Sequence, residues 1–424
     1  MNASAQVQRR QKPHVVVVGG GFAGLRAVRA LRHVDVDVTL IDRHPYNTFY
    51  PLLYQVATAT LNPGDITYFL RAVRARQKNM RFVNGTVTAM DHTAREIVLD
   101  NGGVVVYDHL VVAAGVAANY FGIPGAAEYA LPMYTRTQAL AMRDAIFTKL
   151  EQAAVSGQES DLRVVVVGGG ATGVETAGAL AELRNNDMPA TYPELDPRRT
   201  HITLVEMLPT VLSPFVQRLR DYAHRSLRRR GVDLRLGAAV KEVRPDGVVI
   251  GDDEEFLPAG VVVWASGVTV HESVSKWDLP QGKGGRIVVD DHLRVEGLDN
   301  VYAVGDIAAE TGDRALPQLA QPAIQGGQYV GEQLKRKLQG GEEMDRFEYR
   351  DKGILATIGR SSAVAQIPRV PPLTGFPAWV VWTAVHLFYL LGGRNRLATM
   401  VNLGARYLFW RRNHNAIVGD TPNI

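Results

Sequence analysis

The sequence contains VVVVGGGFAGLRAVRAL at 15–31, and a closely similar stretch, VVVVGGGATGVETAGAL, follows at 164–180. Each begins with four valines, and a short β-branched run that ends in glycines is typical of a buried parallel strand. Each continues with the pattern G-x-G-x-x-G, formed by Gly19, Gly21 and Gly24 and again by Gly168, Gly170 and Gly173. In this pattern the glycines make the tight turn, let the backbone approach a pyrophosphate and let the helix pack on the strand. The two copies therefore predict two dinucleotide-binding folds in one chain.

An acidic residue follows each glycine turn at the end of a second predicted strand. Asp42 ends VDVTLID, near the usual spacing of about 20 residues, and Glu206 ends HITLVE after a longer interval. A polar, proline-rich insertion at 185–199 explains the longer interval. A carboxylate at this place accepts both hydroxyls of an adenosine ribose. The alternative, that the glycine loops are purely structural, does not explain the paired acids.

Composition and charge restrict the function further. The chain has 424 residues and no cysteine, which excludes disulfides, thiolate metal sites, iron–sulfur ligation and a redox-active dithiol. The N-terminus is polar and lacks the apolar core of a signal peptide, so we expect a cytoplasmic protein. The net charge is +4, but residues 352–419 contain eight basic residues and no acid. This basic C-terminal part predicts an anionic partner surface.

Downstream segments resemble the two-dinucleotide-binding flavoprotein superfamily. VYAVGDIAA (301–309) resembles its second flavin motif, a strand that ends in Gly305 and Asp306 and leads into a helix-like stretch. LVVAAGVAAN (110–119) and VVVWASGVTV (261–270) resemble its crossovers between domains. The resemblance implies an α/β fold with two Rossmann-like domains: a split FAD domain at 1–125 and 271–350, and an inserted NADH domain at 126–270. No arginine follows Glu206 to receive a 2′-phosphate, which favours NADH over NADPH.

Two further segments resemble the type II NADH:quinone oxidoreductases. They are the P-L-L-Y-Q-V-A segment at 51–57 and the A-Q-x-A-x-Q-x-G segment that begins at Ala320, and KGILATIGRSSAV (352–364) resembles a third. The resemblance implies non-covalent FAD, bound by Gly19, Gly21, Phe22, Ala23, Gly24, Asp42, Arg43, Asn47, Val87, Ala114, Gly115, Gly305, Asp306, Leu319 and Ala320. It implies NADH as the substrate, bound by Gly168, Gly170, Ala171, Thr172, Gly173, Glu206 and Gly267.

Gln321 and Gln325 are candidates for the quinone site. Pro322 suits the first turn of a helix, which puts Leu319 and Ala320 at its N-terminus, where N–H groups could face the reduced flavin. The two glutamines are four residues apart and share one helix face. Spacing alone favours two solvated glutamines, whereas the resemblance implies hydrogen bonds to quinone carbonyls.

Glu175 and Lys352 are the other catalytic candidates. Glu175 follows the second glycine turn, and a carboxylate there either suits the positive helix end or, as the resemblance implies, carries a proton for quinone reduction. Lys352 is either a surface lysine or, by resemblance, a residue near the quinone pocket. The histidines show no metal-ligand spacing, so we predict no metal.

The C-terminal segment 351–424 is predicted to anchor the protein to a membrane. An apolar run from Phe376 to Leu391, interrupted by His386, is shorter than the roughly 20 residues of a spanning helix. Residues 394–412 carry arginines at both ends. Trp379 and Trp382 lie in the apolar run, and Trp410 lies near the end of residues 394–412. Tryptophan and arginine around apolar helices are typical of a monotopic anchor, and anionic lipid attracts the basic residues. The alternative is that the helices pack on the protein body or form a dimer core.

These features together predict a non-proton-pumping NADH:quinone oxidoreductase on the cytoplasmic face of the membrane. It would transfer a hydride from NADH to FAD and two electrons to menaquinone or ubiquinone, as a homodimer that binds no nucleic acid. One alternative is a soluble NADH:ferredoxin or rubredoxin reductase, and another is a membrane-bound NADH sensor without a hydride path.

Overall fold

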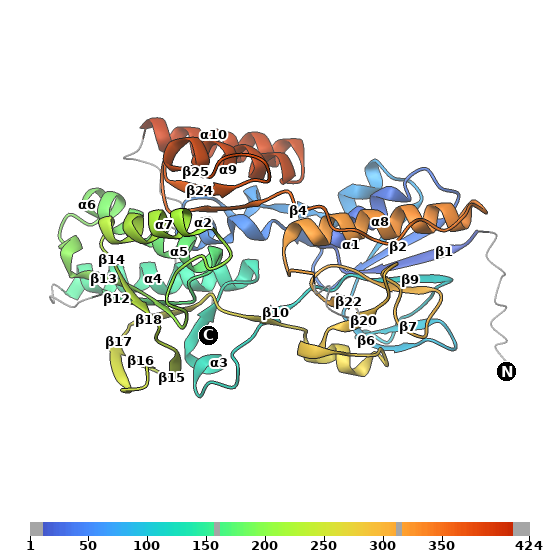
Figure 1. The fold of residues 1–424 in the computed structure, drawn as a ribbon, viewed down its shortest axis with the longest axis horizontal. Helices are drawn as coiled ribbons and strands as arrows, with labels where there is room; N and C mark the ends of the chain where they lie inside the picture. The colour runs from blue at the N-terminus through green and yellow to red at the C-terminus, as the bar shows by residue number, and fades with distance from the viewer. Residues whose placement is uncertain (1–11, 157–161, 311–315, 410–424) are drawn as a thin grey trace. The chain divides into compact units, whose positions relative to one another are not determined.

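The computed structural model describes residues 12–156, 162–310 and 316–409, with side chains omitted at 156 and 406–409. The chain forms two compact units (Figure 1). The first comprises Met1–Asn47, Phe69–Ala117 and Thr269–Asp351, and the second comprises Thr48–Tyr68, Ala118–Val268 and Lys352–Ile424. Trp410, Arg411, Arg412 and the polar N-terminus, on which sequence predictions were made, lie outside the described residues, as does the side chain of Arg406.

The first unit is built on a parallel sheet with the strand order β21-β9-β1-β2-β5. Its strands are β1 (His14–Val18), β2 (Asp37–Asp42), β5 (Met80–Asn84), β9 (His109–Val112) and β21 (Val301–Ala303). Val15, Val16 and Val17 are fully buried, as a strand inside a parallel sheet requires. The unit also contains η3 (Leu70–Ala75), β6 (Val87–Asp91), β7 (Glu96–Leu99), β8 (Val104–Val106), η6 (Glu272–Lys276), η7 (Lys283–Gly285), β20 (Ile287–Val289), β22 (Ala308–Glu310) and α8 (Ala320–Leu338). The first Rossmann-like fold is thus confirmed.

Helices α1 (Phe22–Ala30) and α8 lie side by side in this unit (Figure 1). Glycines on α8 allow the close approach, since a Cβ on Gly327 would lie 2.1 Å from the Ala23 carbonyl oxygen. A Cβ on Gly331 would lie 2.5 Å from the Ala30 Cβ. Helix α1, which follows the first glycine turn, is therefore covered by α8, which is distant from it in the sequence.

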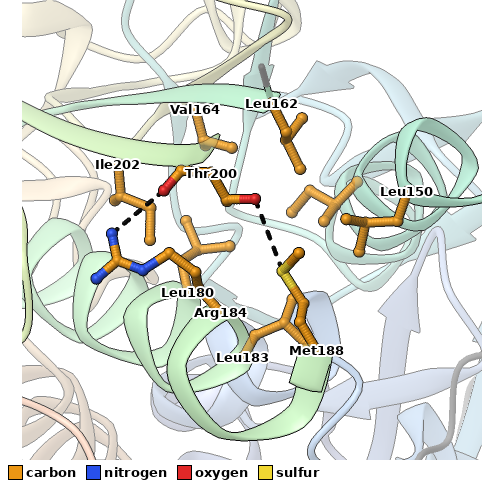
Figure 2. A pocket seen from close by; sticks show the side chains of 10 residues that line it. Leu150, Leu162, Val164, Leu180, Leu183, Arg184, Met188, Thr200 and Ile202 are labelled. Atoms are coloured by element: carbon orange, nitrogen blue, oxygen red, sulfur yellow. Dashed lines mark hydrogen bonds between the residues drawn. The ribbon is translucent and has the colours of Figure 1, made fainter. Parts of the chain in front are cut away.

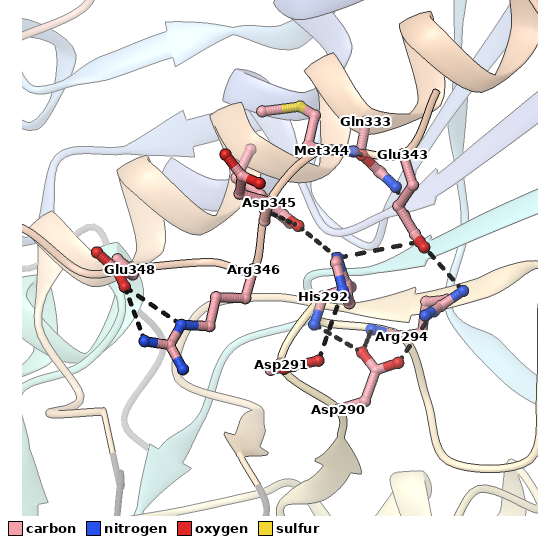
Figure 3. A network of polar contacts seen from close by, with 11 residues as sticks. Asp290, Asp291, His292, Arg294, Gln333, Glu343, Met344, Asp345, Arg346 and Glu348 are labelled. Carbon is pink, nitrogen blue, oxygen red and sulfur yellow. Dashed lines mark hydrogen bonds and ion pairs between the residues drawn. The ribbon is translucent and has the colours of Figure 1, made fainter. Parts of the chain in front are cut away.

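A polar network holds the chain that follows α8 against the loop at 290–294 (Figure 3). Arg294 makes ion pairs with Asp290 at 2.9 Å and with Glu343 at 3.2 Å. The Tyr329 hydroxyl donates to the Asp345 carbonyl at 2.9 Å and lies 2.9 Å from His292 Nδ1. These contacts fix residues 343–348, which have no regular secondary structure of their own.

The second unit repeats the sheet with the strand order β11-β18-β12-β13-β14, again all parallel. Its strands are β11 (Ala130–Pro132), β12 (Leu162–Val167), β13 (Thr200–Glu206), β14 (Val232–Leu236) and β18 (Val261–Trp264). Its helices are η1 (Tyr50–Leu52), α2 (Leu53–Ala57), η2 (Pro63–Asp65), α3 (Ala126–Tyr129), α4 (Arg136–Ser156), α5 (Ala171–Glu182), α7 (Gln217–Arg229), α9 (Gly375–Tyr389) and α10 (Gly393–Phe409). An antiparallel sheet of β15 (Val240–Arg244), β16 (Gly247–Ile250) and β17 (Glu255–Pro258) and another of β23 (Ile354–Thr357), β24 (Ala363–Gln366) and β25 (Leu373–Thr374) complete it.

The first part of the insertion at 185–199 extends the helix that follows the second glycine turn, and the rest forms a loop with a short 3-10 turn. After α5 come the π-helical η4 (Leu183–Asp187), α6 (Met188–Thr191) and η5 (Pro197–Arg199). A π-helical turn accommodates extra residues within an α-helix. The longer interval between the second glycine turn and Glu206 thus lies in the helix and the loop that follows it.

Candidate functional site

The first glycine turn has the geometry that a pyrophosphate requires. Gly19 has φ +107°, and a Cβ there would lie 2.2 Å from the Ala113 carbonyl oxygen. A Cβ on Gly24 would lie 1.9 Å from the Gly19 carbonyl oxygen, whereas a Cβ on Gly21 would meet nothing within 4 Å. Gly19 and Gly24 are therefore needed for packing, and Gly21 borders open space at the N-terminus of α1, beside Phe22 and Ala23.

The second turn repeats this geometry atom for atom. Gly168 has φ +113°, and a Cβ there would lie 2.7 Å from the Ala265 carbonyl oxygen. A Cβ on Gly173 would lie 1.8 Å from the Gly168 carbonyl oxygen, and one on Gly170 would again meet nothing within 4 Å. Ala171 and Thr172 begin α5. Both turns fit the pyrophosphate of a dinucleotide.

The two acids hold the turns in the same way. Asp42 accepts the Gly20 N–H at 2.6 Å and the His44 N–H at 2.7 Å. Glu206 accepts the Gly169 N–H at 2.5 Å and the Leu208 N–H at 2.8 Å. A carboxylate has about four acceptor positions, so each retains capacity for ribose hydroxyls. Burial raises the pKa of Asp42.

Other residues predicted to bind FAD surround the first turn or lie on neighbouring elements. Asn47 is buried and donates to the Gly20 carbonyl at 2.8 Å, and Arg43 is exposed. Ala114 and Gly115 follow β9, and a Cβ on Gly115 would meet nothing within 4 Å. Val87 begins β6, paired with Leu99.

In the predicted second flavin motif, β21 ends at Ala303 and the turn with Gly305 and Asp306 comes next, but no helix follows this turn directly. Residues 308–310 form β22, which pairs with β20, so the predicted helix-like stretch is wrong. Gly305 has φ +79°, and burial raises the pKa of Asp306 to about 6, opposed by Arg286. The Gln318 amide donates to the Asp306 carbonyl at 3.1 Å. It thereby joins this turn to Leu319, the N-cap of α8, and to Ala320, its first residue.

Gln321 and Gln325 both lie in the first turns of α8, but their surroundings differ. The Gln321 Oε1 atom is buried without a partner among the described residues. The Gln325 amide instead bonds the backbone of Arg350 twice, with both distances at 3.0 Å. Gln325 is therefore occupied in holding the segment after α8. Lys352 belongs to the second unit and is exposed just before β23.

Glu175 lies on α5 inside the second unit and is 7% exposed. Its Oε1 accepts the Thr357 backbone N–H at 3.1 Å and the Trp382 indole N–H at 3.1 Å. Burial raises the pKa of Glu175 to about 8, and the two hydrogen bonds oppose the rise. A pKa of about 8 keeps most of the carboxyl protonated at neutral pH.

The buried position of Trp382 contradicts part of the membrane prediction. Instead of lying at a membrane interface, Trp382 is 2% exposed and packs inside the unit. Its ring stacks on His386, with 4.0 Å between centroids, and lies 6.4 Å from the Tyr54 ring at an angle of 62°. Tyr54, Thr357, Trp382 and His386 were not predicted to lie around Glu175. The only signal was that Trp382 and His386 are four residues apart on one helix.

Helix α10 buries polar side chains and exposes several apolar ones. On α10, Thr399 is fully buried, and the amides of Asn395 and Asn402 donate at 2.6 Å to the Thr67 carbonyl and to Asp65. The outer face exposes Leu397 at 58% of its surface. The other exposed apolar residues of α9 and α10 are Phe376, Val380, Phe388, Met400 and Val401. Within the described part of the chain, no helix has both the length and the apolar character needed to cross a bilayer.

Gly267, just after β18, lies under an aromatic ring. A Cβ on Gly267 would lie 2.1 Å from the Cζ atom of Phe121, and the Tyr134 hydroxyl donates to the Gly267 carbonyl at 2.9 Å. Phe121 is exposed and has φ +54°, which is uncommon for an aromatic residue. The sequence analysis did not identify it.

An apolar pocket in the second unit is not the nucleotide site (Figure 2). It is lined by residues of α4, β12, α5, η4, α6 and β13, among them Leu150, Leu162, Thr200 and Ile202. Leu162 and Thr200 are the first residues of their strands, whereas dinucleotides bind beyond the carboxyl ends. Among the described residues, no cluster of three histidine or acidic side chains could hold a metal.

Comparison with known proteins agrees with this geometry. The family described as pyridine nucleotide-disulphide oxidoreductase matches residues 13–327, and the one described as NDH2 C-terminal domain matches residues 352–412. The type II NADH:quinone oxidoreductase Ndh of Mycobacterium tuberculosis is 36% identical over 430 residues, covering 98% of this chain and 92% of that protein. The type II NADH:quinone oxidoreductase of Staphylococcus haemolyticus is 33% identical over 368 residues, covering 84% and 90%.

Solved structures share the fold at lower identity. NDH2 of Plasmodium falciparum in complex with NADH superposes with a TM-score of 0.86 at 22% identity, covering 95% of this chain and 99% of that one. The sulfide:quinone oxidoreductase of Aquifex aeolicus has a TM-score of 0.74 at 19% identity, covering 94% and 96%. On the fold, the paired glycine turns and the near full-length identity, the chain belongs to the type II NADH:quinone oxidoreductases of the pyridine nucleotide-disulphide oxidoreductase family.

Proposed function

We propose that this protein oxidises NADH and reduces a membrane quinone, with FAD as a resident cofactor. The observation that carries the proposal is the pair of complete dinucleotide folds in a chain of this family that has no cysteine. One fold suits a permanent carrier and the other an exchanging donor, and no dithiol can serve as the acceptor. When bound, FAD accepts a hydride from NADH and passes two electrons to the quinone.

We assign FAD to the first unit and NADH to the second. Gly21, Asp42, Asn47 and Asp306 belong to the first unit, and the N-terminus of α8 lies beside Asp306 through Gln318. Backbone N–H groups at a helix N-terminus stabilise negative charge on a bound ring. In the second unit, Glu206 is followed by Met207 and Leu208, so no guanidinium there favours a 2′-phosphate.

We assign one of the two protons of quinone reduction to Glu175, whose carboxyl has a pKa of about 8 and so holds a proton at neutral pH. A group with a pKa near the working pH both gives and regains a proton readily. Gln321 is the better of the two glutamine candidates for a quinone carbonyl, because its Oε1 has no partner among the described residues. An amide with an unpaired oxygen can rotate to present its N–H₂ group. Lys352, which is exposed and basic, is a weaker candidate for a residue near the quinone.

We propose that the outer faces of α9 and α10 dock into one leaflet of a membrane. A helix in water turns its apolar face inward, whereas α10 buries Asn395 and Thr399 and exposes Leu397, Met400 and Val401. Exposed Arg394, at the start of α10, suits anionic headgroups. Docking at the cytoplasmic face and a homodimer with two such anchors complete the proposal.

Spectroscopy of the purified protein tests the reaction. We expect a bound flavin spectrum that NADH bleaches and that menaquinone or ubiquinone analogues restore, with lower kcat/KM for NADPH. Restoration by a ferredoxin or rubredoxin but not by quinones would favour the soluble reductase. A protein that binds NADH without any flavin would favour the sensor.

Sedimentation with anionic vesicles tests docking separately. We expect the Leu397→Glu and Met400→Glu double variant to remain in the supernatant at low ionic strength, while wild type sediments with the vesicles. Val104→Glu, at an exposed apolar residue of β8, is the matched control that sediments like wild type. Equal sedimentation of all three proteins contradicts docking through α10.

A further inference from the structure

We propose that Trp382 is a positioning residue for Glu175: its indole N–H fixes the carboxyl through Oε1 and so sets the readiness of that group to exchange a proton. The inference rests on the proposed proton role of Glu175. It gives α9, which carries Trp382, a role at the Glu175 carboxyl in addition to the proposed membrane docking.

The geometry at the carboxyl is well defined. The Trp382 Nε1 and the Thr357 backbone nitrogen each lie 3.1 Å from Glu175 Oε1. Both donors come from the C-terminal segment. Among the described residues, the hydrogen bonds of this carboxyl all go to Oε1, which leaves Oε2 as the atom that holds the proton.

Glycine on α5 makes this arrangement possible. A Cβ on Gly178 would lie 2.7 Å from the carbonyl of Ile358, so only glycine lets the end of β23 approach the helix. Glu175 and Gly178 are three residues apart and share a helix face. The same approach brings the Thr357 N–H to the carboxyl. Glu182, on the next turn of α5, accepts the Arg360 N–H at 2.5 Å. This bond adds a second attachment of the chain after β23 to α5.

The indole of Trp382 is itself held in place. His386 stacks on it and, because a carbonyl oxygen only accepts, His386 Nδ1–H donates to the Trp382 carbonyl at 2.6 Å. Burial lowers the pKa of His386 to about 4, so the imidazole is neutral at physiological pH. The opposite face of α9 exposes Phe376 and Phe388, so one helix holds the carboxyl and presents the apolar surface.

No neighbouring charged side chain accounts for the raised pKa of Glu175. His386 on α9 is uncharged at neutral pH, because burial lowers its pKa to about 4. Tyr222 on α7 is hydrogen-bonded to Ser362, and Glu206 at the end of β13 to the second glycine turn. Burial and the two hydrogen bonds are the causes of the Glu175 pKa, with no charged side chain among them. Removing one donor therefore acts on the carboxylate directly.

Infrared titration of the Glu175 carboxyl measures the effect without turnover. The band is identified by its loss in Glu175→Gln, and Trp382→Phe keeps an aromatic ring but removes the N–H. Because a hydrogen bond to a charged group stabilises the ionised form, we expect the midpoint to rise by about one pH unit in Trp382→Phe. Trp277→Phe is the matched control: Trp277 is buried, and its Nε1 has no hydrogen-bond partner among the described residues. An unchanged midpoint in Trp382→Phe overturns the inference.

A wild-type measurement covers the case in which Trp382→Phe does not fold. The chain has five tryptophans, so indole N–H signals in nitrogen-labelled protein are few. We expect one indole signal to titrate with the midpoint of the carboxyl band and to lose that dependence in Glu175→Gln. If no indole signal follows the carboxyl, Trp382 does not contact it in solution.

Kinetics separate this inference from the proposed function. We expect the pH at which kcat for quinone falls to move upward in Trp382→Phe, with no added shift when the change is made in Glu175→Gln. Quinone turnover that Glu175→Gln leaves intact contradicts the proton role, whatever the infrared result. A normal loss in Glu175→Gln together with an unshifted profile in Trp382→Phe contradicts only the positioning role.

Discussion

The two glycine turns share their geometry but differ in the helix that follows. Aligned from their valines, the copies place Arg26 of α1 opposite Glu175 of α5, and Arg29 opposite Gly178. Arg26 is half-buried and Arg29 is exposed, whereas Glu175 is buried and Gly178 is covered by the carbonyl of Ile358. The glycine turns are therefore alike in the two copies, whereas one face of the helix that follows carries different residues with different burial.

The difference lies in what covers each helix. Helix α1 packs on α8 through alanines and glycines, which leaves room for no charged group on that face. Helix α5 packs on β23 of the C-terminal segment, and Trp382 of α9 donates to its carboxyl. Glu175 is thus buried because the C-terminal segment covers this face of α5, whereas the equivalent face of α1 carries the half-buried Arg26 and the exposed Arg29. Burial without a cationic partner then raises the pKa of Glu175.

Alanine at the third glycine of either turn should have the largest effect. A Cβ less than 2 Å from a carbonyl oxygen forces backbone movement, so we expect Gly24→Ala and Gly173→Ala each to lower the free energy of unfolding by about 3 kcal/mol or more. Gly24→Ala should also lose FAD, and Gly173→Ala should raise KM for NADH. Denaturant unfolding, the flavin absorbance ratio and steady-state kinetics measure the three effects.

The middle glycines are the matched controls for that comparison. Gly21→Ala and Gly170→Ala meet open space and should unfold like wild type, while still weakening the binding of FAD and NADH respectively. Loss of NADH affinity from Gly21→Ala with FAD retained would reverse the assignment of the two units.

Glu175→Gln should lower kcat for quinone by at least about 100-fold, because a positioned general acid contributes that much. Reduction of ferricyanide, which takes electrons without protons, should be nearly unchanged. Arg26→Gln, at the equivalent position of α1, is the control and should leave the ratio of the two activities as in wild type. Equal losses with both acceptors would place the defect before the quinone step.

The buried carboxyl should also make stability depend on pH. Between its ordinary pKa of 4.5 and about 8, the folded state holds a proton that the unfolded state has released, so the free energy of unfolding falls as pH rises. Relative to Glu175→Gln, wild type should lose a few kcal/mol across this window, and the difference should be flat below it and above it. Denaturant unfolding of both proteins in a pH series measures this, and parallel curves would mean that the carboxyl titrates normally.

Gly178→Ala should have the smallest effect, about 1–3 kcal/mol in the free energy of unfolding, because the methyl group meets the Ile358 carbonyl. Arg29→Ala, the equivalent substitution on α1, removes an exposed side chain and should stay within about 0.5 kcal/mol of wild type. Thermal unfolding of the pair is sufficient. A larger loss from Arg29→Ala than from Gly178→Ala would contradict the importance of the close approach between α5 and the Ile358 carbonyl.

Local patterns in the sequence predicted much of the fold and part of the site. The valine runs and glycine spacing gave both parallel sheets, and the acids at Asp42 and Glu206 were found because they follow a strand at a characteristic interval. The start of α8 at Ala320 followed from Pro322. The helix-like stretch after Asp306 was wrong because pairing with β20, which is separated in sequence, decides that segment.

By itself, the sequence determined the two dinucleotide folds, the absence of thiol chemistry and the apolar character of the C-terminal helices, because strand burial, tight turns and composition are local properties. Only the tertiary structure decided that Trp382 faces inward to Glu175, that Gln325 binds the Arg350 backbone and that the polar face of α10 is the buried one. Such contacts join residues from distant parts of the chain, and the pKa of a carboxyl depends on the desolvation and donors that those contacts create.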